Sequence, residues 1–321
     1  MVTVRRVQRK SAVLSPSSLA CLSKILTVNL TMGCAHGCLY CYTRGYRAYP
    51  GEGKVDLFEN TLEKLQSELR RKRHKPDAVY FSPASDLFQP VPDVLDMAYD
   101  VLQYLLTRDI GIAFLTKGTI PEKHMSLMLE HPDIVRAQMG LITTNDELLQ
   151  VFEPHAAPVA VRLEQTRRLT SRGIKAQLRI DPILPAVTDD ARTLDELCRA
   201  AVACGVRQLA ASALFLRPAP MRRLAEAAKT SLHVAQCLAQ FKSPRRLAIH
   251  AERSTVMALA VTEREAIFQR LEGIAAQYGL RVKRCACKNP DIATGTCSIA
   301  GEPQRKSAAA QTGLFDQPME R

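Results

Sequence analysis

The chain has no tryptophan, and aromatic residues make up only 5% of its 321 positions. Platforms of aromatic side chains for stacking nucleobases are therefore not evident. Long apolar runs are also absent, since none approaches the roughly 20 residues of a membrane-spanning helix. Residues 1–24 lack acidic side chains and show no secretory cleavage pattern, so we interpret them as a basic N-terminal arm. We expect a globular, cytoplasmic protein without a membrane segment.

Positive charge is in excess in this chain. Lysine and arginine number 44 against 32 aspartates and glutamates, which gives a formal net charge of +12. A single basic group at the end of a helix would only complement the helix dipole. Here the basic residues gather in five separate groups, at 5–10, 69–75, 217–223, 242–246 and 281–284. This distribution indicates a surface that binds phosphates, and DNA is the first partner to consider.

Strand-like and helix-like segments alternate from residue 25 to residue 215. Strands are expected at 25–30, 78–82, 110–116, 134–143, 174–180 and 206–215. Helices are expected at 56–73, 92–107, 121–130, 157–172 and 190–204, with capping boxes at Asp56 and Glu59 and at Thr193 and Glu196. This alternation predicts right-handed crossovers and a parallel sheet. Because about six units are too few for a closed eight-stranded barrel, the predicted fold is α/β, an open partial (β/α)6 barrel.

The alternation weakens after Arg217. Helices are expected at 219–240 and 262–278, the second with a capping box of Thr262 and Glu265, and a strand is expected at 280–284. From about residue 302 the composition is polar and rich in alanine and glutamine, which is typical of disorder. We therefore divide the chain into a basic arm (1–24), a barrel (25–217), a C-terminal extension (218–301) and a disordered tail (302–321).

Ten cysteines fall into two groups and four scattered positions, a pattern unlike a disulfide framework. The scattered ones are interpreted as buried thiols, and they are Cys21, Cys198, Cys204 and Cys237. The first group is Cys34, Cys38 and Cys41, with spacing C-x3-C-x2-C on a glycine-containing loop. Four cysteines normally hold a four-iron cluster, so three predict a cluster with one open coordination position. The loop follows the first strand, which places it at the mouth of the barrel.

Residues 31–43, TMGCAHGCLYCYT, resemble the cluster loop of radical S-adenosylmethionine (SAM) enzymes. Further stretches narrow the resemblance to the spore photoproduct lyase-like family, namely SDLFQP at 85–90, LTKGTI at 115–120, FEPHAAPVAVRLE at 152–164 and RIDPILP at 179–185. All of them fall at the expected places in the order of strands and helices. The resemblance covers roughly residues 5–215.

The resemblance implies a 4Fe–4S cluster on Cys34, Cys38 and Cys41, with SAM bound to the free iron. A reductant such as flavodoxin or ferredoxin would supply one electron, and SAM would be cleaved to methionine and a 5′-deoxyadenosyl radical that abstracts hydrogen from a substrate. Candidates to hold SAM end the expected strands, and they are Ser82, Ser85, Asp86, Lys117, Thr143, Thr144, Arg179 and Asp181. Lys117 would pair with the SAM carboxylate or a nearby anion. Tyr40 stands where the family has an aromatic residue whose backbone contacts the adenine.

The chain departs at one position from the pattern of the family that it resembles. In spore photoproduct lyase, as the resemblance implies, a cysteine just ahead of the aspartate after the second strand returns a hydrogen atom to the product. Here that stretch reads SPASD, without a cysteine from 82 to 86. DNA is the leading substrate class for a radical reaction. Two other interpretations stay open, namely radical modification of a peptide or small metabolite, and a cluster-bearing nucleic-acid-binding protein without turnover.

The second cysteine group is Cys285, Cys287 and Cys297, with spacing C-x-C-x9-C in a turn-rich segment. Nearby basic residues favour thiolates, which are the form that binds metals. We therefore predict a second metal site, occupied by an auxiliary iron–sulfur cluster or by zinc, with free thiols as the alternative. Its fourth ligand would be Asp291, a distant side chain or the substrate.

The tail contains QTGLF at residues Gln311–Phe315. This stretch resembles the short peptide with which bacterial replication and repair proteins dock on the DNA sliding clamp. Leu314 and Phe315 have no core to join in an exposed tail, and a docking peptide gives them one. The sliding clamp is therefore a candidate partner, with a chance match or a terminal helical turn as the alternatives.

Overall fold

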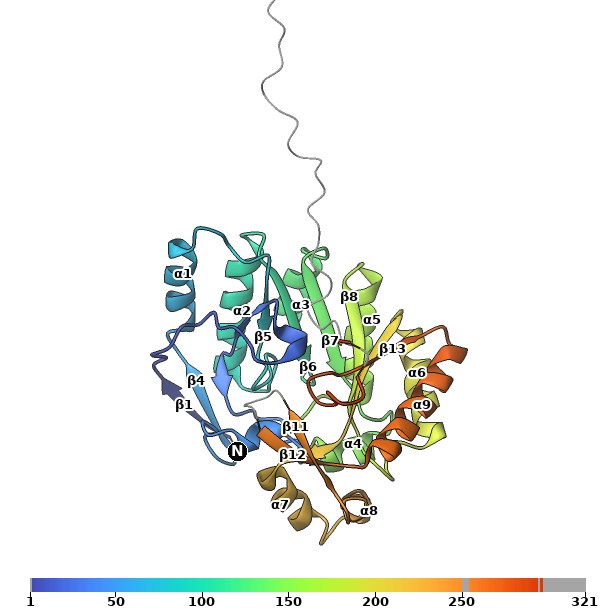
Figure 1. The fold of residues 1–321 in the computed structure, drawn as a ribbon. Helices are drawn as coiled ribbons and strands as arrows, with labels where there is room; N and C mark the ends of the chain where they lie inside the picture. Colours follow the sequence, from blue (N-terminus) through green and yellow to red (C-terminus); the bar gives the residue numbers. More distant parts are fainter. Residues whose placement is uncertain (1, 250–253, 294, 297–321) are drawn as a thin grey trace, which may run out of the picture.

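The fold is built around a seven-stranded sheet, seen in a computed structural model that describes residues 2–249, 254–293 and 295–296 (Figure 1). The strands follow the order β13-β9-β8-β7-β6-β5-β2, and every neighbouring pair is parallel. They are β2 (Leu26–Val28), β5 (Ala78–Phe81), β6 (Gly111–Thr116), β7 (Val135–Gly140), β8 (Lys175–Ile183), β9 (Gln208–Ala213) and β13 (Arg281–Arg284). Among the described residues the edge strands β2 and β13 do not pair with each other, so the sheet is open. The predicted α/β class is confirmed.

Helices connect the strands and pack against the outer face of the sheet (Figure 1). The helices of the barrel are α1 (Thr61–Arg71), α2 (Pro92–Leu106), α3 (Glu122–Leu129), α4 (Asp146–Phe152), α5 (Val159–Ser171) and α6 (Ala191–Ala203). Helix α2 shows why they form, because Val94, Val101 and Leu105 lie on one buried stripe. Its first residue is Pro92, at a position where the missing N–H has no intrahelical partner to lose.

The N-terminal segment does not extend away from the fold as a separate arm. Thr3–Val7 forms β1, which pairs in parallel with β4 (Lys54–Phe58), and β4 pairs antiparallel with β3 (Thr31–Met32). Arg5 and Asp56 join β1 to β4 through two side-chain hydrogen bonds. The predicted helix at 56–73 is therefore wrong at its start, because Asp56 lies in a strand and α1 begins at Thr61.

The C-terminal part continues the barrel sheet. The strand expected at 280–284 is confirmed as β13, which pairs with β9 and gives the sheet its seventh strand. The helix expected at 219–240 is two helices, α7 (Pro218–Ala227) and α8 (Leu232–Ala239). A small antiparallel sheet that was not predicted contains β10 (Phe215–Leu216), β12 (Ser254–Ala258) and β11 (Arg245–Ile249). The tail with Gln311–Phe315 and the residue Cys297 lie outside the described residues.

Besides the box at Asp56 and Glu59, the two other predicted capping boxes are also wrong, each by a few residues. Helix α6 is capped by Asp190, whose carboxylate accepts a hydrogen bond from the Thr193 backbone N–H. Helix α9 (Val261–Gln277) begins after Ala260, whose backbone N–H donates to Glu263. Glu265, expected in that cap, instead pairs with Arg284. None of the described helices is both long and apolar enough to cross a bilayer.

Candidate active site

A cavity opens at the carboxyl ends of the parallel strands. Ser82 follows β5, Lys117 follows β6, Asp181 lies near the end of β8 and Ser212 lies in β9, and all four line the cavity. These strands come from most of the width of the sheet, so the sheet curves around this space. The cavity therefore lies where parallel barrels place their chemistry.

The first cysteine group lies on the loop between β3 and the short helix η2 (Tyr42–Gly45), and all three sulfur-bearing residues line the cavity. The loop depends on glycine. Gly33 has φ +85°, and a Cβ there would lie 2.4 Å from the Lys54 carbonyl oxygen. Gly37 has φ +68°, and a Cβ there would lie 3.3 Å from a ring carbon of His155. Only glycine takes up both the left-handed backbone and the close approach without strain.

Hydrogen bonds from distant parts of the chain hold the cysteine loop. The Leu39 backbone N–H donates to the Phe152 carbonyl at 2.9 Å. The Ala35 backbone N–H donates to Gln89 Oε1 at 2.9 Å. The His36 carbonyl accepts from the His155 backbone N–H at 3.1 Å. The loop is thus fixed before any ligand binds, which reduces the ordering cost of binding.

A buried cluster of charges lies beside the loop. Glu153 is fully buried, and its two carboxylate oxygens each lie 2.7 Å from a cation, Lys117 Nζ and Arg162 Nη1. The Tyr40 hydroxyl donates to Glu153 and lies 2.5 Å from Lys117 Nζ. Burial raises the pKa of Glu153, but Lys117 and Arg162 lower it more, to about 2. Lys117 therefore has a nearby anion, as expected, and this anion is a protein carboxylate.

Asp86 holds the loop after β5 in place. Its carboxylate accepts hydrogen bonds from the Phe88 backbone N–H, the Thr116 hydroxyl and the Lys117 backbone N–H, at 2.7 to 2.8 Å. His36 Nε2 lies 3.1 Å from the same carboxylate, and the His36 side chain is buried. Burial raises the pKa of Asp86, but these neighbours lower it more.

On the opposite side of the cavity Asp181 is the centre of a second charged group. Arg179 Nε donates to it at 2.8 Å, and Lys288 Nζ lies 2.6 and 2.7 Å from its two oxygens. The Ser212 hydroxyl also donates to this carboxylate. Burial raises the pKa of Asp181, but Lys288 and Arg179 hold it well below its usual range. Arg179 thus pairs with Asp181 and, through Nη2, with the sulfur of Cys285 at 3.2 Å.

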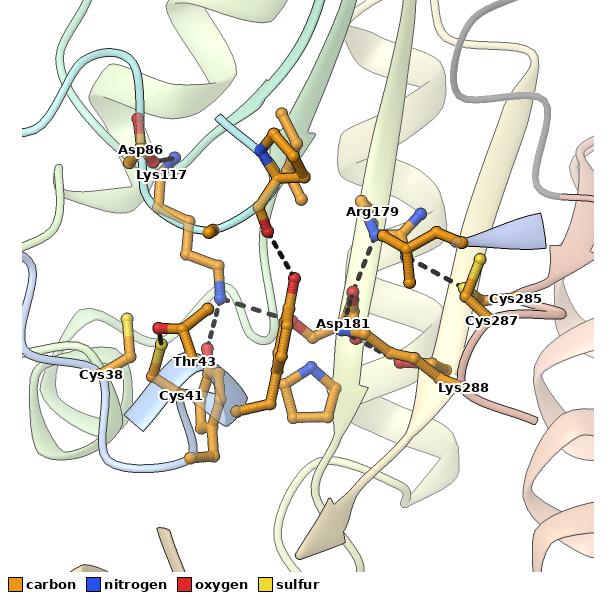
Figure 2. A pocket seen from close by; sticks show the side chains of 18 of the residues that line it. Cys38, Cys41, Thr43, Asp86, Lys117, Arg179, Asp181, Cys285, Cys287 and Lys288 are labelled. Carbon is orange, nitrogen blue, oxygen red and sulfur yellow. Dashed lines mark hydrogen bonds and ion pairs between the residues drawn. The ribbon is translucent and has the colours of Figure 1, made fainter. Parts of the chain in front are cut away.

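A second group of sulfur atoms lies at this side of the cavity. Figure 2 shows Cys38 and Cys41 on one side and Cys285 and Cys287 on the other, with Asp181 between them. The sulfur of Cys21 completes the second group. The three sulfur atoms of this group all lie within 4.8 Å of one another. The interpretation of Cys21 as a scattered buried thiol is therefore wrong.

This chain is similar to known proteins in both sequence and fold. The sequence profile of the radical SAM superfamily matches residues 28–198, more than half of the chain. The chain belongs to the radical SAM superfamily. A spore photoproduct lyase variant with bound AdoMet and dinucleoside spore photoproduct has a similar fold, with a TM-score of 0.66, 13% identity, and coverage of 87% of this chain and 81% of that one.

Two relatives are similar in sequence to this radical SAM protein. An uncharacterized protein of Mycobacterium tuberculosis is 26% identical over 67% of this chain and 66% of its own length. A radical SAM Nalpha-GlyT isomerase of Pseudomonas phage M6 is 29% identical over 55% of this chain and 37% of its own length. The chain thus spans just under two thirds of the mycobacterial protein and little more than a third of the phage enzyme.

Membership of the radical SAM superfamily implies a 4Fe–4S cluster and SAM, and the cysteine loop fits the cluster. Burial raises the pKa of the Cys38 thiol to about 12, and it raises that of Cys34 well above its ordinary value. Buried thiols of this kind lose their protons when a metal binds, because the cation replaces the proton. Cys34, Cys38 and Cys41 are the three ligands that this radical SAM loop offers.

Two buried hydroxyls fit SAM. Ser82 Oγ and Ser85 Oγ are shielded from solvent, line the cavity and have no hydrogen-bond partner among the described residues. A buried hydroxyl without a partner costs free energy, so a polar ligand is the natural partner for both. Tyr42, Leu214 and Phe215 add an apolar wall suited to a nucleoside ring.

The other predicted SAM residues differ in their positions. Tyr40, Asp86, Lys117 and Arg179 all line the cavity. Thr143 is not among the lining residues, and its hydroxyl instead accepts a hydrogen bond from the Asn145 backbone N–H just before α4.

Proposed function

We propose that this protein is a radical SAM enzyme that cleaves SAM reductively and abstracts hydrogen from a nucleic-acid substrate. The observation that carries the SAM reaction is one cavity lined by three loop cysteines and two unpaired buried hydroxyls, Ser82 and Ser85. When bound, the cluster would supply one electron and SAM would supply the 5′-deoxyadenosyl group for radical chemistry.

The chain's own residues bind and orient the cluster and SAM, and they exclude water from the cavity. Cys34, Cys38 and Cys41 hold the cluster, while Ser82 and Ser85 donate hydrogen bonds to SAM. Lys117 is fixed by Glu153 and Tyr40, so it presents a positive charge at a constant place on the cavity wall. Such preorganisation is what a reaction through a radical requires, because side reactions with water must be prevented.

The distribution of exposed basic residues supports a nucleic-acid substrate. Arg245 and Arg246 are exposed on β11, and Ile249 at the other end of the same strand lines the cavity. The basic group at 69–75 lies elsewhere, since it precedes the N-terminal end of β5, whereas the cavity lies at the C-terminal ends. In the group at 5–10, Arg5 and Arg6 pair with carboxylates. We therefore assign phosphate binding to the β11 edge, and the dinucleoside bound by the spore photoproduct lyase fold is consistent with it.

A cytoplasmic setting fits this proposal. The reaction needs reduced cysteines and a low-potential reductant such as flavodoxin or ferredoxin, and the cytoplasm keeps thiols reduced. The sliding clamp remains a proposed partner through residues 311–315.

The SAM reaction is tested by anaerobic reconstitution with iron, sulfide, SAM and dithionite. Release of 5′-deoxyadenosine is expected from the unsubstituted protein and from Cys237→Ala, whose thiol is buried in α8 and does not line the cavity. No release is expected from Cys38→Ala. Equal release from Cys38→Ala and Cys237→Ala would refute the assignment of the cluster loop.

The substrate class is tested by the salt dependence of binding to a DNA duplex and to the corresponding single strand. Each phosphate contact contributes about 0.9 to the slope of log K against log salt concentration on a duplex. Arg245→Gln/Arg246→Gln should therefore reduce that slope by about 2. The matched pair Arg70→Gln/Arg71→Gln, exposed at the end of α1, should leave it unchanged. Salt-independent or absent binding would favour a peptide or small metabolite, and steep binding without SAM cleavage would favour a binding protein without turnover.

A further inference from the structure

The three sulfur atoms of Cys21, Cys285 and Cys287 come from opposite ends of the chain. Cys21 lies in the short helix η1 (Ala20–Leu22), and Cys285 directly follows the last residue of β13. Pairing of β13 with β9 brings this end of the chain into the barrel, and the Cys285 backbone N–H donates to the Ala211 carbonyl at 2.8 Å. The Cys21 backbone N–H donates to Cys287 Sγ at 3.2 Å across 266 residues of sequence.

The spacing of these sulfur atoms is that of ligands around a single ion. All three lie within 4.8 Å of one another. Two thiolates that are each about 2.3 Å from a tetrahedral zinc ion lie about 3.8 Å apart, so small shifts close the group around one ion. A four-iron cluster requires wider spacing, because each of its cysteines binds a different iron atom.

Charged groups beside the sulfur atoms suit a bound metal ion. Arg179 Nη2 donates to Cys285 Sγ at 3.2 Å, and such charge-assisted hydrogen bonds stabilise a thiolate. Three thiolates and one divalent ion carry a single negative charge. Arg179, Lys288 and Asp181 together carry a single positive charge and lie beside them. The charges of the site are thus balanced.

Apolar residues pack around the sulfur atoms. Leu22, Tyr80, Ala113 and Ala210 form a small buried cluster with Cys285 and Cys287. A shell of this kind excludes water and strengthens the bonds between metal and ligand. One expected ligand is excluded by its contacts, since both carboxylate oxygens of Asp291 bind Arg264, at 2.5 and 2.8 Å.

We propose that Cys21, Cys285 and Cys287 bind one zinc ion in the wall of the cavity. Soft thiolates with near-tetrahedral spacing select zinc among the common divalent ions. All three cysteines line the cavity, so the fourth ligand comes from the cavity. The ion joins the N-terminal segment to β13 and closes one side of the cavity, at the place where Arg179 and Lys288 are held. The site does not depend on SAM cleavage.

The test uses the full chain, purified anaerobically, with the first site removed by Cys34→Ala/Cys38→Ala/Cys41→Ala so that zinc cannot occupy it. Elemental analysis should then find about one zinc ion per chain and no iron. Adding Cys21→Ala should remove the zinc, whereas adding Cys237→Ala should retain it. Zinc that persists after Cys21→Ala would overturn the assignment, as would iron and sulfide retained by the background variant.

A second measurement needs no substitution at the site, so it remains decisive if a variant does not fold. X-ray absorption at the zinc edge of the unsubstituted protein, with its first site filled by reconstitution with iron and sulfide, should show three or four sulfur neighbours at about 2.3 Å. A spectrum with only oxygen or nitrogen neighbours, or a purified protein without zinc, would overturn the proposal. A disulfide among the three cysteines, seen by mass spectrometry of the unreduced protein, would overturn it as well. Release of 5′-deoxyadenosine is measured separately, so failure of the zinc site is distinguishable from failure of the SAM reaction.

Discussion

Replacing Glu153 by glutamine tests the buried charge cluster next to the cysteine loop. Glu153 is the one anion between Lys117 and Arg162 in this cluster, and both cations are buried or nearly so. Glu153→Gln keeps the shape of the side chain and removes its charge. The two cations then remain inside the protein without compensation, which is costly.

Two routes give the size of the effect. The first is the pKa of Glu153, which is lowered from 4.5 to about 2, corresponding to about 3 kcal/mol at neutral pH. The second is the removal of one partner from a buried ion pair, which costs about 3–5 kcal/mol. With about 2.1 cal/mol/K of unfolding entropy per residue over 321 residues, about 3 kcal/mol lowers Tm by about 4–5 °C.

The pH dependence has a definite sign. Because the pKa of Glu153 is lower in the folded state, its stabilisation is complete above about pH 4.5 and is lost as pH falls towards 2. The difference in Tm between the unsubstituted protein and Glu153→Gln should therefore be largest near pH 7 and shrink in acid.

Thermal unfolding followed by circular dichroism at one fixed scan rate provides the measurement. Glu164→Gln is the matched control, because Glu164 lies on α5 as Arg162 does, and its pairing with Arg167 is exposed to solvent. It should leave Tm almost unchanged. A Tm for Glu153→Gln equal to that of Glu164→Gln would refute the reasoning about buried charge.

Further predictions concern the cysteine loop and the SAM site. Gly33→Ala should lower both Tm and the iron content after reconstitution, because its Cβ would meet the Lys54 carbonyl at 2.4 Å. Gly53→Ala is the control, because it has a similar conformational cost at φ +67° but open space around its Cβ. It should retain iron. Equal iron loss in both variants would contradict this explanation. Ser85→Ala should weaken SAM binding about fivefold by calorimetry, through one lost hydrogen bond worth about 1 kcal/mol, and it should not lower the Tm of the SAM-free protein. Unchanged SAM affinity would exclude Ser85 from the site.

Local patterns predicted most of the barrel. Apolar stretches such as residues 110–116 and amphipathic stretches such as 92–107 carry their periodicity within a few residues, so β6 and α2 were predicted nearly to their ends. Strand β4 was missed because Lys54–Phe58 alternates charged and apolar residues just ahead of a true helix. Its strand character comes from pairing with β1, about 50 residues away in the sequence. Strands β11 and β12 were missed for the same reason, since each is stabilised by the other.

In the candidate site, too, features set by local sequence were predicted, and features set by contacts between distant residues were missed. The three cysteines of the loop stand close together in the sequence, so their spacing alone indicated a cluster. Glu153 and Arg162 were not selected, although both lie in the stretch at 152–164 that carries the family resemblance. Their role depends on a salt bridge formed inside the fold. Cys21 was missed because only the pairing of β13 with β9 brings the C-terminal cysteines to it.

The proposed reaction is hydrogen abstraction by a SAM-derived radical from a nucleic acid bound at this cavity. Its most direct test incubates the reconstituted protein with SAM, a reductant and a DNA oligonucleotide carrying deuterium on its carbon-bound positions. We predict that 5′-deoxyadenosine is released and that it carries deuterium from the DNA, as seen by mass spectrometry. Release without deuterium would contradict the nucleic-acid substrate, and no release from protein with an intact cluster spectrum would contradict the radical SAM reaction itself.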